Sequence, residues 1–225
     1  MNARILFLAL ALTSAATAPR AQAQLVTYTF GSSASPTTAA NSVATNLGAS
    51  AFSGSLGSPT TGSGTPVYSA GSGGSFFTAS AWTGSAPGSN YFEFTLTPTN
   101  GYRFDVTSIS FGYRATGTGP TAIAIRSTND GYASNLASST LTNDGTWHAS
   151  GAISITLSAL SSATTIRVYG SGASASGGTL RLDDVTLNGT VSAVPEPAAI
   201  AAFGGMAALL AVIVHRRRQR FATKV

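Results

Sequence analysis

The sequence predicts an all-β protein whose main part, residues 24–192, folds as an antiparallel β-sandwich. Apolar and polar side chains alternate with the period of two that marks a half-buried strand, along about eight or more segments. Turn sequences rich in Gly, Asn, Asp and Pro separate these segments. An apolar pattern of helical length occurs only near the two ends of the 225-residue chain. These three observations favour a sandwich over a helical or mixed fold.

Residues 1–23 have the features of a secretory signal peptide. Arg4 gives a positive start, residues 5–12 are apolar, and Ala21-Gln22-Ala23 matches the small-residue pattern of a cleavage site. We therefore expect export and cleavage before Gln24. A buried helix is the alternative for the apolar stretch, but its position at the start of the chain favours the signal.

The first strand is expected at residues 25–30, and a low-complexity segment follows at residues 31–90. Only nine residues of that segment fall outside Gly, Ala, Ser, Thr, Pro and Asn, and none is charged. Such composition is common in flexible linkers. The spaced aromatic residues favour short strands and long loops on the surface of the β-domain.

From residue 91 onward the strand pattern is regular. Phe92, Phe94 and Leu96 alternate with polar residues, and the same period continues at 109–113, 123–125, 153–157 and 166–168. Asn129-Asp130-Gly131 and Asn143-Asp144-Gly145 are turn sequences, because Asn, Asp and Gly tolerate the left-handed conformation.

The last strand contains a change of phase. Leu180 and Leu182 share one parity, whereas Val185 and Leu187 share the other. A β-bulge at Asp183-Asp184 would turn both pairs toward one core.

The run from Gly178 to Gly189 resembles the closing strand of jelly-roll β-sandwich domains of the galactose-binding-like group. Residues 111–120 are similar to strand and loop pieces found beside that strand in anchored bacterial exoproteins. The resemblance implies a jelly-roll ectodomain and identifies no ligand.

Residues 193–225 form a distinct C-terminal segment. Residues 198–214 carry no charge, and as a helix they would be about 25 Å long, close to the roughly 30 Å apolar layer of a bilayer. The basic tail, residues 215–225, includes Arg216, Arg217, Arg218 and Arg220. The positive-inside rule then predicts a single transmembrane helix with a cytoplasmic tail. A core helix is the alternative for residues 198–214.

The order of Pro195-Glu196-Pro197, an apolar helix and an Arg cluster resembles the PEP-CTERM sorting signal. In that family an exosortase, a membrane protease-transpeptidase, recognises exported bacterial proteins, and the family is associated with exopolysaccharide and biofilm. The resemblance implies that Pro195, Glu196 and Pro197 form the sorting motif. It also implies exosortase and the membrane as partners before processing, and the cell surface or extracellular matrix as the destination. A stiff spacer before a helix is the simpler interpretation of Pro-x-Pro.

The positive charge of the chain belongs to its ends. The whole sequence has a net charge of +5 and a pI near 10.0. Residues 24–192, however, carry five Arg against six acidic residues, a net charge of −1, and no lysine. This balance argues against nucleic acid as a partner. The absence of cysteine excludes disulfides and thiol chemistry.

Residues with catalytic or metal-binding chemistry are few. His148 is the only histidine in residues 24–192, and no nucleophile-elbow sequence accompanies it. We therefore expect no enzymatic activity, no catalytic residue and no cofactor. Calcium is the one metal to consider, since it prefers the oxygen ligands that loop carboxylates supply. Its candidate ligands are Asp183, Asp184, Asp130 and Asp144.

Aromatic residues that could bind sugar include Trp82 and Trp147, although most such residues pack in a core. Three hypotheses follow from the sequence. The first is an exported, non-catalytic structural protein of the cell envelope or exopolysaccharide matrix. The second is a carbohydrate-binding or adhesive surface module, with exopolysaccharide as its partner. The third, a secreted hydrolase, is the weakest because His, Glu and Lys are scarce. The sequence does not predict an oligomeric state.

Overall fold

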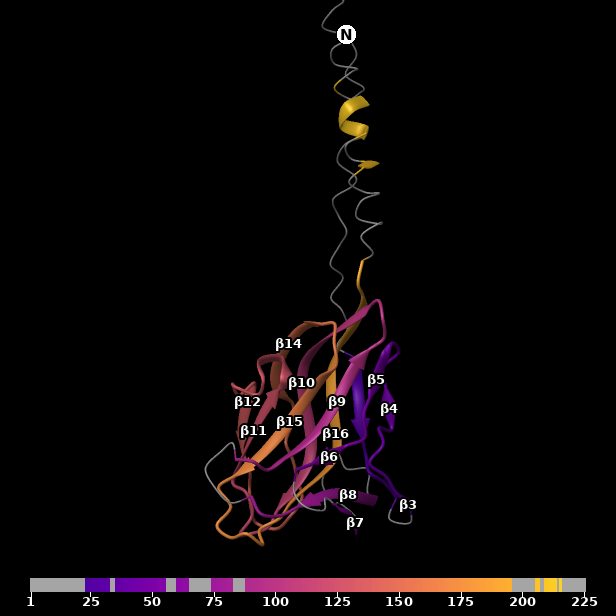
Figure 1. Ribbon diagram of the computed structural model, residues 1–225. Coiled ribbons are helices and arrows are strands. Elements are labelled where there is room, and N and C mark those ends of the chain that lie inside the picture. The colour runs from indigo at the N-terminus through magenta and orange to yellow at the C-terminus, as the bar shows by residue number, and fades with distance from the viewer. Residues whose placement is uncertain are drawn as a thin grey trace, which may run out of the picture.

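The computed structural model shows two antiparallel β-sheets packed face to face as a sandwich, which confirms the predicted all-β class (Figure 1). A small two-stranded ribbon, β2 (Gly31–Ser32) and β3 (Ser35–Pro36), lies beside them. The residues that the structure describes are 23–32, 35–55, 60–64, 74–82, 88–195, 205–206, 209–213 and 215.

Two long strands form the centre of the larger, eight-stranded sheet. They are β10 (Tyr102–Ala115) and β16 (Leu180–Ala193), which pair antiparallel along their whole length. On one side of this pair lie β13 (His148–Ala149) and β14 (Ile153–Leu160). On the other side β16 pairs first with β8 (Gly74–Ala79) and then with β1 (Ala23–Tyr28). The edges are β7 (Thr60–Gly64) and β4 (Ser42–Val43).

The smaller sheet has six strands. Its order is β12 (Ala137–Thr140), β11 (Ala122–Ser127), β15 (Thr164–Ser171), β9 (Tyr91–Pro98) and β5 (Leu47–Ala49), with β6 (Ser53–Gly54) also paired to β9. A short 3₁₀ turn, η1 (Thr128–Asp130), follows β11 and ends at Gly131 in the left-handed conformation, as the turn sequence predicts.

The core lies between the sheets and is rich in aromatic rings. Phe52 is at its centre, with its ring centroid 5.0 Å from that of Phe77, 5.2 Å from Phe30 and 5.3 Å from Tyr28. Phe52 and Phe77 belong to the low-complexity segment, and both are buried. The described part of residues 31–90 therefore forms short strands, as expected, but it also supplies core residues instead of only covering the surface.

The predicted bulge is present in β16. Ser110 pairs with Thr186 and Gly112 pairs with Asp183, so β16 has one more residue than β10 between these two pairs. Asp184 takes a positive φ of 48° within this bulge. Leu180, Leu182, Val185 and Leu187 are consequently all buried in one core.

The predicted C-terminal membrane anchor is not supported. Within the part of the chain that the structure describes, no helix is long and apolar enough to cross a membrane. The predicted localisation, a protein anchored by a span at 198–214 with a cytoplasmic tail, is therefore wrong.

The other terminal predictions fall almost entirely outside the described residues. Pro195 is described and exposed. The remainder of the predicted sorting motif, the basic cluster and the signal peptide lie beyond the described ranges, namely Glu196, Pro197, Arg216, Arg217, Arg218, Arg220 and residues 1–22. The sorting signal stays a prediction from the sequence.

Candidate functional site

Trp82, one of the two predicted ligand-binding tryptophans, is a core residue. Its side chain is 1% exposed, and its indole N–H donates to the carbonyl oxygen of Ala79 at 2.9 Å. Its ring packs edge-on against Phe92, with centroids 4.9 Å apart. Because the ring is enclosed and its one donor is satisfied, Trp82 is not available to a ligand.

Trp147, the second candidate, lies near the surface at one end of the larger sheet. It is partly exposed, and its ring packs edge-on against Phe76 with centroids 5.7 Å apart. The guanidinium carbon of Arg181 lies 4.7 Å from the centre of the same Phe76 ring. Arg181 and Arg114 are direct cross-strand partners on β16 and β10. We call these four residues, Phe76, Arg114, Trp147 and Arg181, the Arg-aromatic face.

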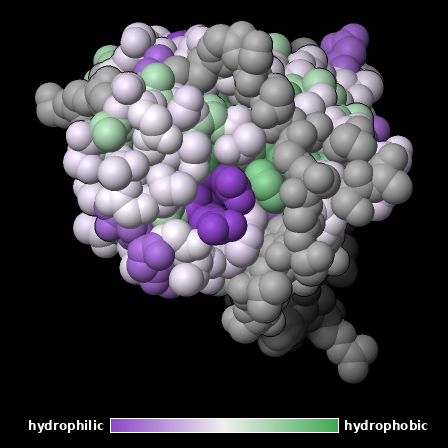
Figure 2. Space-filling model, turned by 90° about the horizontal axis from the view of Figure 1, so that it is seen from below, coloured by the Kyte–Doolittle hydropathy of each residue, from purple (hydrophilic) through white to green (hydrophobic). Residues whose placement is uncertain are grey.

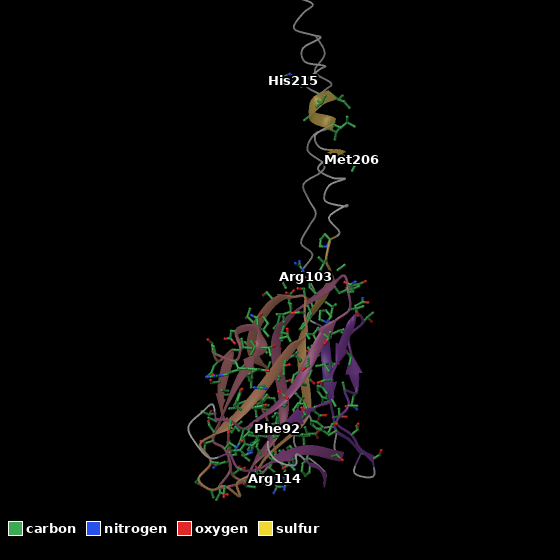
Figure 3. The ribbon with its side chains drawn as sticks, in the orientation of Figure 1. Phe92, Arg103, Arg114, Met206 and His215 are labelled. Carbon is green, nitrogen blue, oxygen red and sulfur yellow. The ribbon has the colours of Figure 1, made fainter. Side chains whose placement is uncertain are left out.

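The Arg-aromatic face lies at the end of the domain farthest from Arg103, as the labels of Arg103 and Arg114 at opposite ends of Figure 3 show. β7 and β8 cross this end of the sandwich (Figure 1). Figure 2 views the molecule from this end, and strongly hydrophilic side chains gather at the centre of the view, next to a hydrophobic one.

Arg181 is held in an unfavourable environment. Burial and the neighbouring charge of Arg114 lower the pKa of the Arg181 guanidinium. The Nε of Arg181 and the Oγ1 of Thr179 are buried without a hydrogen-bond partner among the described residues. Each such group costs about 1–3 kcal/mol in the folded state, more when charged. Arg114, by contrast, donates from Nε to the carbonyl oxygen of Gly145 at 2.6 Å.

The turn that carries Trp147 also contains the predicted calcium ligand Asp144. Its Oδ1 accepts hydrogen bonds from the backbone amide and the hydroxyl of Thr146, both at 2.8 Å, and lies 3.0 Å from Nε2 of His148. The bond to His148, followed by those to Thr146, lowers the pKa of Asp144 to about 2. The His148 ring also stacks on Tyr113. His148 begins β13, and its Nε2 contacts both Asp144 and the hydroxyl of Thr146, whereas in a Ser-His-Asp hydrolase the acid and the hydroxyl contact different ring nitrogens.

Asp183 is the most unusual acidic residue. Its side chain is 0% exposed, Oδ1 accepts from the backbone amide of Asp184 at 2.8 Å, and Oδ2 has no partner among the described residues. Burial, and then the charge of Asp184, raise the pKa of Asp183 to about 7. Asp183 pairs with Gly112 on β10 at the bulge.

The four predicted calcium ligands are not gathered at one place. Asp183 and Asp184 are neighbours in the bulge, and Asp144 lies in the turn before β13. Asp130 accepts from the backbone amides of Ala133 and Ser134 in the turn after β11. Among the described residues, no group of three or more His, Cys, Asp or Glu could hold a metal ion. Calcium takes six to eight oxygen ligands, so a site at any one of these positions would need further oxygen ligands, and the calcium hypothesis stays a prediction.

A second polar cluster lies on the outer surface of the smaller sheet. Arg167 forms an ion pair with Glu93 at 2.9 Å, and its guanidinium lies 3.7 Å from the ring centre of Tyr91 and 3.9 Å from that of Tyr132. The charge and both faces of this guanidinium are satisfied within the protein. We therefore consider the Arg-aromatic face the better candidate site.

Sequence reasoning missed Arg114 and Arg181 as functional residues. Their signal was present, because both occupy outward positions of strands whose inward positions are apolar. Their pairing depends on the register between β10 and β16, and the phase change at the bulge is the only trace of that register in the sequence.

Comparisons with known proteins find similarity of shape only. No protein-family profile and no curated protein sequence matches the chain. A Clostridium thermocellum structure of the CBM22-1 and GH10 modules of endo-1,4-beta-D-xylanase 10B, complexed with xylohexaose, is 17% identical. It matches 64% of this chain and 27% of its own, with a TM-score of 0.36. The K3 cleaved adhesin domain of Lys-gingipain from Porphyromonas gingivalis is 13% identical over 53% of this chain and 76% of its own, with a TM-score of 0.32. Tailspike protein 4 of bacteriophage CBA120 is 17% identical over 65% of this chain and 20% of its own, with a TM-score of 0.34. This similarity is too low to assign a family or a ligand.

Proposed function

We propose that the β-sandwich is a non-catalytic carbohydrate-binding module and that the Arg-aromatic face is its binding surface. One observation carries the proposal. The guanidinium of Arg181 lies over the Phe76 ring, beside the partly exposed Trp147, and Arg181 directly faces Arg114 across the strands. Two like charges kept side by side cost stability and are expected where they serve a ligand.

The chemistry of the face suits a sugar. A pyranose ring has an apolar C–H surface that packs on aromatic rings, and hydroxyl groups that accept hydrogen bonds at its edge. The partly exposed Trp147 supplies the ring, and Arg114 and Arg181 supply guanidinium donors. Both arginines belong to the two longest strands of the domain. A site on paired strands is held more rigidly than one on loops, which lowers the entropy lost on binding.

The carboxylates near this face support binding over hydrolysis. A glycosidase needs two carboxyl groups that face one sugar bond from either side. Asp144 is engaged by Thr146 and His148, and Asp183 is enclosed within the bulge. Neither carboxyl group is presented to a ligand stacked on Trp147 in the way that acid catalysis requires.

A purely structural protein of an extracellular matrix is the alternative. Such a protein would gain nothing from two adjacent arginines of like charge, since they lower stability. We favour binding for that reason. The finer assignments, a jelly-roll of the galactose-binding-like group and an exosortase sorting signal at Pro195-Glu196-Pro197, are retained as proposals on the sequence resemblances alone.

Affinity electrophoresis of the purified protein through gels that contain soluble polysaccharides tests the proposal. We expect at least one polysaccharide to retard wild type, and Trp147→Ala to abolish the retardation. Tyr102→Ala, a partly exposed aromatic residue at the opposite end of β10, is the matched control and should behave as wild type. Failure of a broad panel of polysaccharides to retard wild type would contradict the proposal.

A further inference from the structure

We infer that the ligand of the Arg-aromatic face is an acidic polysaccharide, one of whose anionic groups binds between Arg114 and Arg181. This inference rests on the proposed function and specifies the class of sugar. It goes beyond sugar binding in general because a neutral glycan would leave the two guanidinium charges uncompensated.

The register of the larger sheet brings the two charges together. Arg114 and Arg181 are directly opposed on β10 and β16, so their β-carbons are separated by about 5 Å, as in any such pair. Like charges directly opposite each other in a sheet destabilise it. The contact with Phe76 orients the Arg181 guanidinium but does not neutralise it. An anion between the two groups would remove the repulsion by binding to both guanidinium groups.

Two carboxylates of the protein lie near this pair, and both are engaged elsewhere: Asp144 by Thr146 and His148, and Asp183 within the bulge. Residues 31–90, which supply β8 and the loops beside it, contain no acidic residue. The ion pairs among the described residues join Arg167 to Glu93 and His148 to Asp144, and neither includes Arg114 or Arg181. Asp105, farther along β10, accepts a hydrogen bond from the backbone amide of Ala159.

The aromatic residues distinguish a sugar from a simple anion. Trp147 packs against Phe76, and Phe76 lies under Arg181, so ring surface and positive charge are continuous. A pyranose ring that carries a carboxylate, as in a uronic acid, would place its C–H face on the aromatic rings and its negative charge on the arginines. A free anion would use the arginines alone and gain nothing from Trp147.

The test compares five probes by affinity electrophoresis or calorimetry with the full-length protein. Polygalacturonate carries carboxylates, dextran sulfate carries sulfates, and unmodified dextran is neutral. Inorganic phosphate and single-stranded DNA test for a simple anion site and for non-specific attraction of polyanions. We expect binding to the acidic polysaccharides, with the stronger of the two showing which anionic group fits. Binding should weaken as salt is added, because the charges are partly exposed to solvent.

Two variants remove the charge while preserving the fold. Arg181→Met keeps an unbranched apolar stem over Phe76 but removes the buried unsatisfied Nε. Arg114→Gln removes the opposing charge. For each we expect the affinity to fall by about 10- to 100-fold, as for the loss of one hydrogen bond to a charged group. Arg103→Gln, at the far end of β10, is the control and should bind as wild type (Figure 3).

Stability separates a binding role from a structural one. A structural Arg181 would lower the melting temperature when replaced, whereas the inferred role predicts that Arg181→Met melts at the same temperature as wild type or higher. Three results would overturn the inference: dextran bound as tightly as the acidic polymers, phosphate or DNA competing fully, or Arg181→Met binding normally. If dextran bound and Trp147→Ala abolished that binding, the inference would fall while the proposed function stood. If no polysaccharide bound, both would fall.

Discussion

Replacing Asp183 with asparagine should remove a large pH dependence from the stability of the domain. The Asp183 side chain is completely buried, and burial followed by the charge of Asp184 raises its pKa to about 7, from an ordinary value of 3.8. The folded state therefore holds a proton that the unfolded state releases above pH 3.8. Stability that is fully present below pH 3.8 is lost as the pH rises to about 7.

The magnitude follows from the two pKa values. Each tenfold change in proton affinity corresponds to about 1.4 kcal/mol, so the difference between 3.8 and about 7 gives an upper value of about 4 kcal/mol. About 3 kcal/mol of this loss should occur between about pH 5 and about pH 8. The amide side chain of the Asp183→Asn variant would remain neutral throughout and keep an oxygen to accept from the amide of Asp184.

Urea denaturation of wild type and Asp183→Asn at these two pH values measures the effect. Relative to the variant, wild type should lose about 3 kcal/mol on going to the higher pH, or roughly 1–2 M in the urea midpoint. Asp130→Asn is the matched control, because Asp130 is exposed in a turn and should not change the response in this pH range. A wild-type midpoint that does not fall relative to Asp183→Asn would refute the account of Asp183.

The same titration tests the calcium hypothesis. A bound cation would favour ionised Asp183, so calcium would raise the wild-type midpoint at the higher pH and leave Asp183→Asn unchanged. We expect excess calcium to change neither midpoint, because Asp183 and Asp184 alone among the four candidates are neighbours. A rise confined to wild type would establish a site that includes ligands beyond these two.

Three further predictions concern the frame that holds the candidate site. Gly178→Ala should destabilise the domain by about 1–3 kcal/mol in urea denaturation, because the added Cβ would overlap the backbone of Thr118. The control Gly177→Ala, whose added Cβ has open space around it, should be nearly neutral, and equal effects of the two changes would contradict this account. Phe52→Ala should lower the free energy of unfolding by about 3–5 kcal/mol in the same assay, since the Phe52 ring contacts other aromatic rings at the centre of the core. A loss below about 1 kcal/mol, close to that of a surface change, would show that this segment is not packed as described. Asp144→Asn should make the domain unfold at a higher pH on acidification, because the hydrogen bond to its histidine partner holds the pKa of Asp144 near 2, and the stability from this lowered pKa is present above pH 3.8 and lost as the pH falls toward 2. An unchanged acid-unfolding midpoint would count against the observed turn.

Local patterns in the sequence were sufficient to predict the strands from residue 91 onward. Phe92, Phe94 and Leu96 alternate with polar residues, and β9 buries all three. The bulge at Asp183-Asp184 was predicted for the same reason, because a phase change in a two-residue period has few other solutions. The low-complexity segment gave a weaker signal, and its buried aromatic residue Phe52 could not be assigned to the core without knowing what packs around it.

The C-terminal anchor shows the limit of reasoning from composition. An uncharged stretch at 198–214 next to a basic cluster matches the sequence pattern of a membrane span, whereas no helix in the described part of the chain is long and apolar enough to cross a membrane. Hydropathy measures the tendency of a segment to leave water. It does not establish that the segment forms one continuous helix of sufficient length.

The all-β class, the positions of the regular strands and the main turns follow from the sequence alone, because they depend on contacts between residues near in the chain. Which outward residues meet is set by the packing of the fold. Arg114 and Arg181 are 67 positions apart, and they face each other solely through the register of β10 and β16, which the bulge at Asp183 sets. The sequence offers Trp82 and Trp147 as equal candidates, yet Trp82 is enclosed by the core, whereas Trp147 lies partly exposed beside the arginine pair. Pairing over such distances depends on the whole packing of the two sheets, and for that reason the candidate site could not be recognised from the sequence.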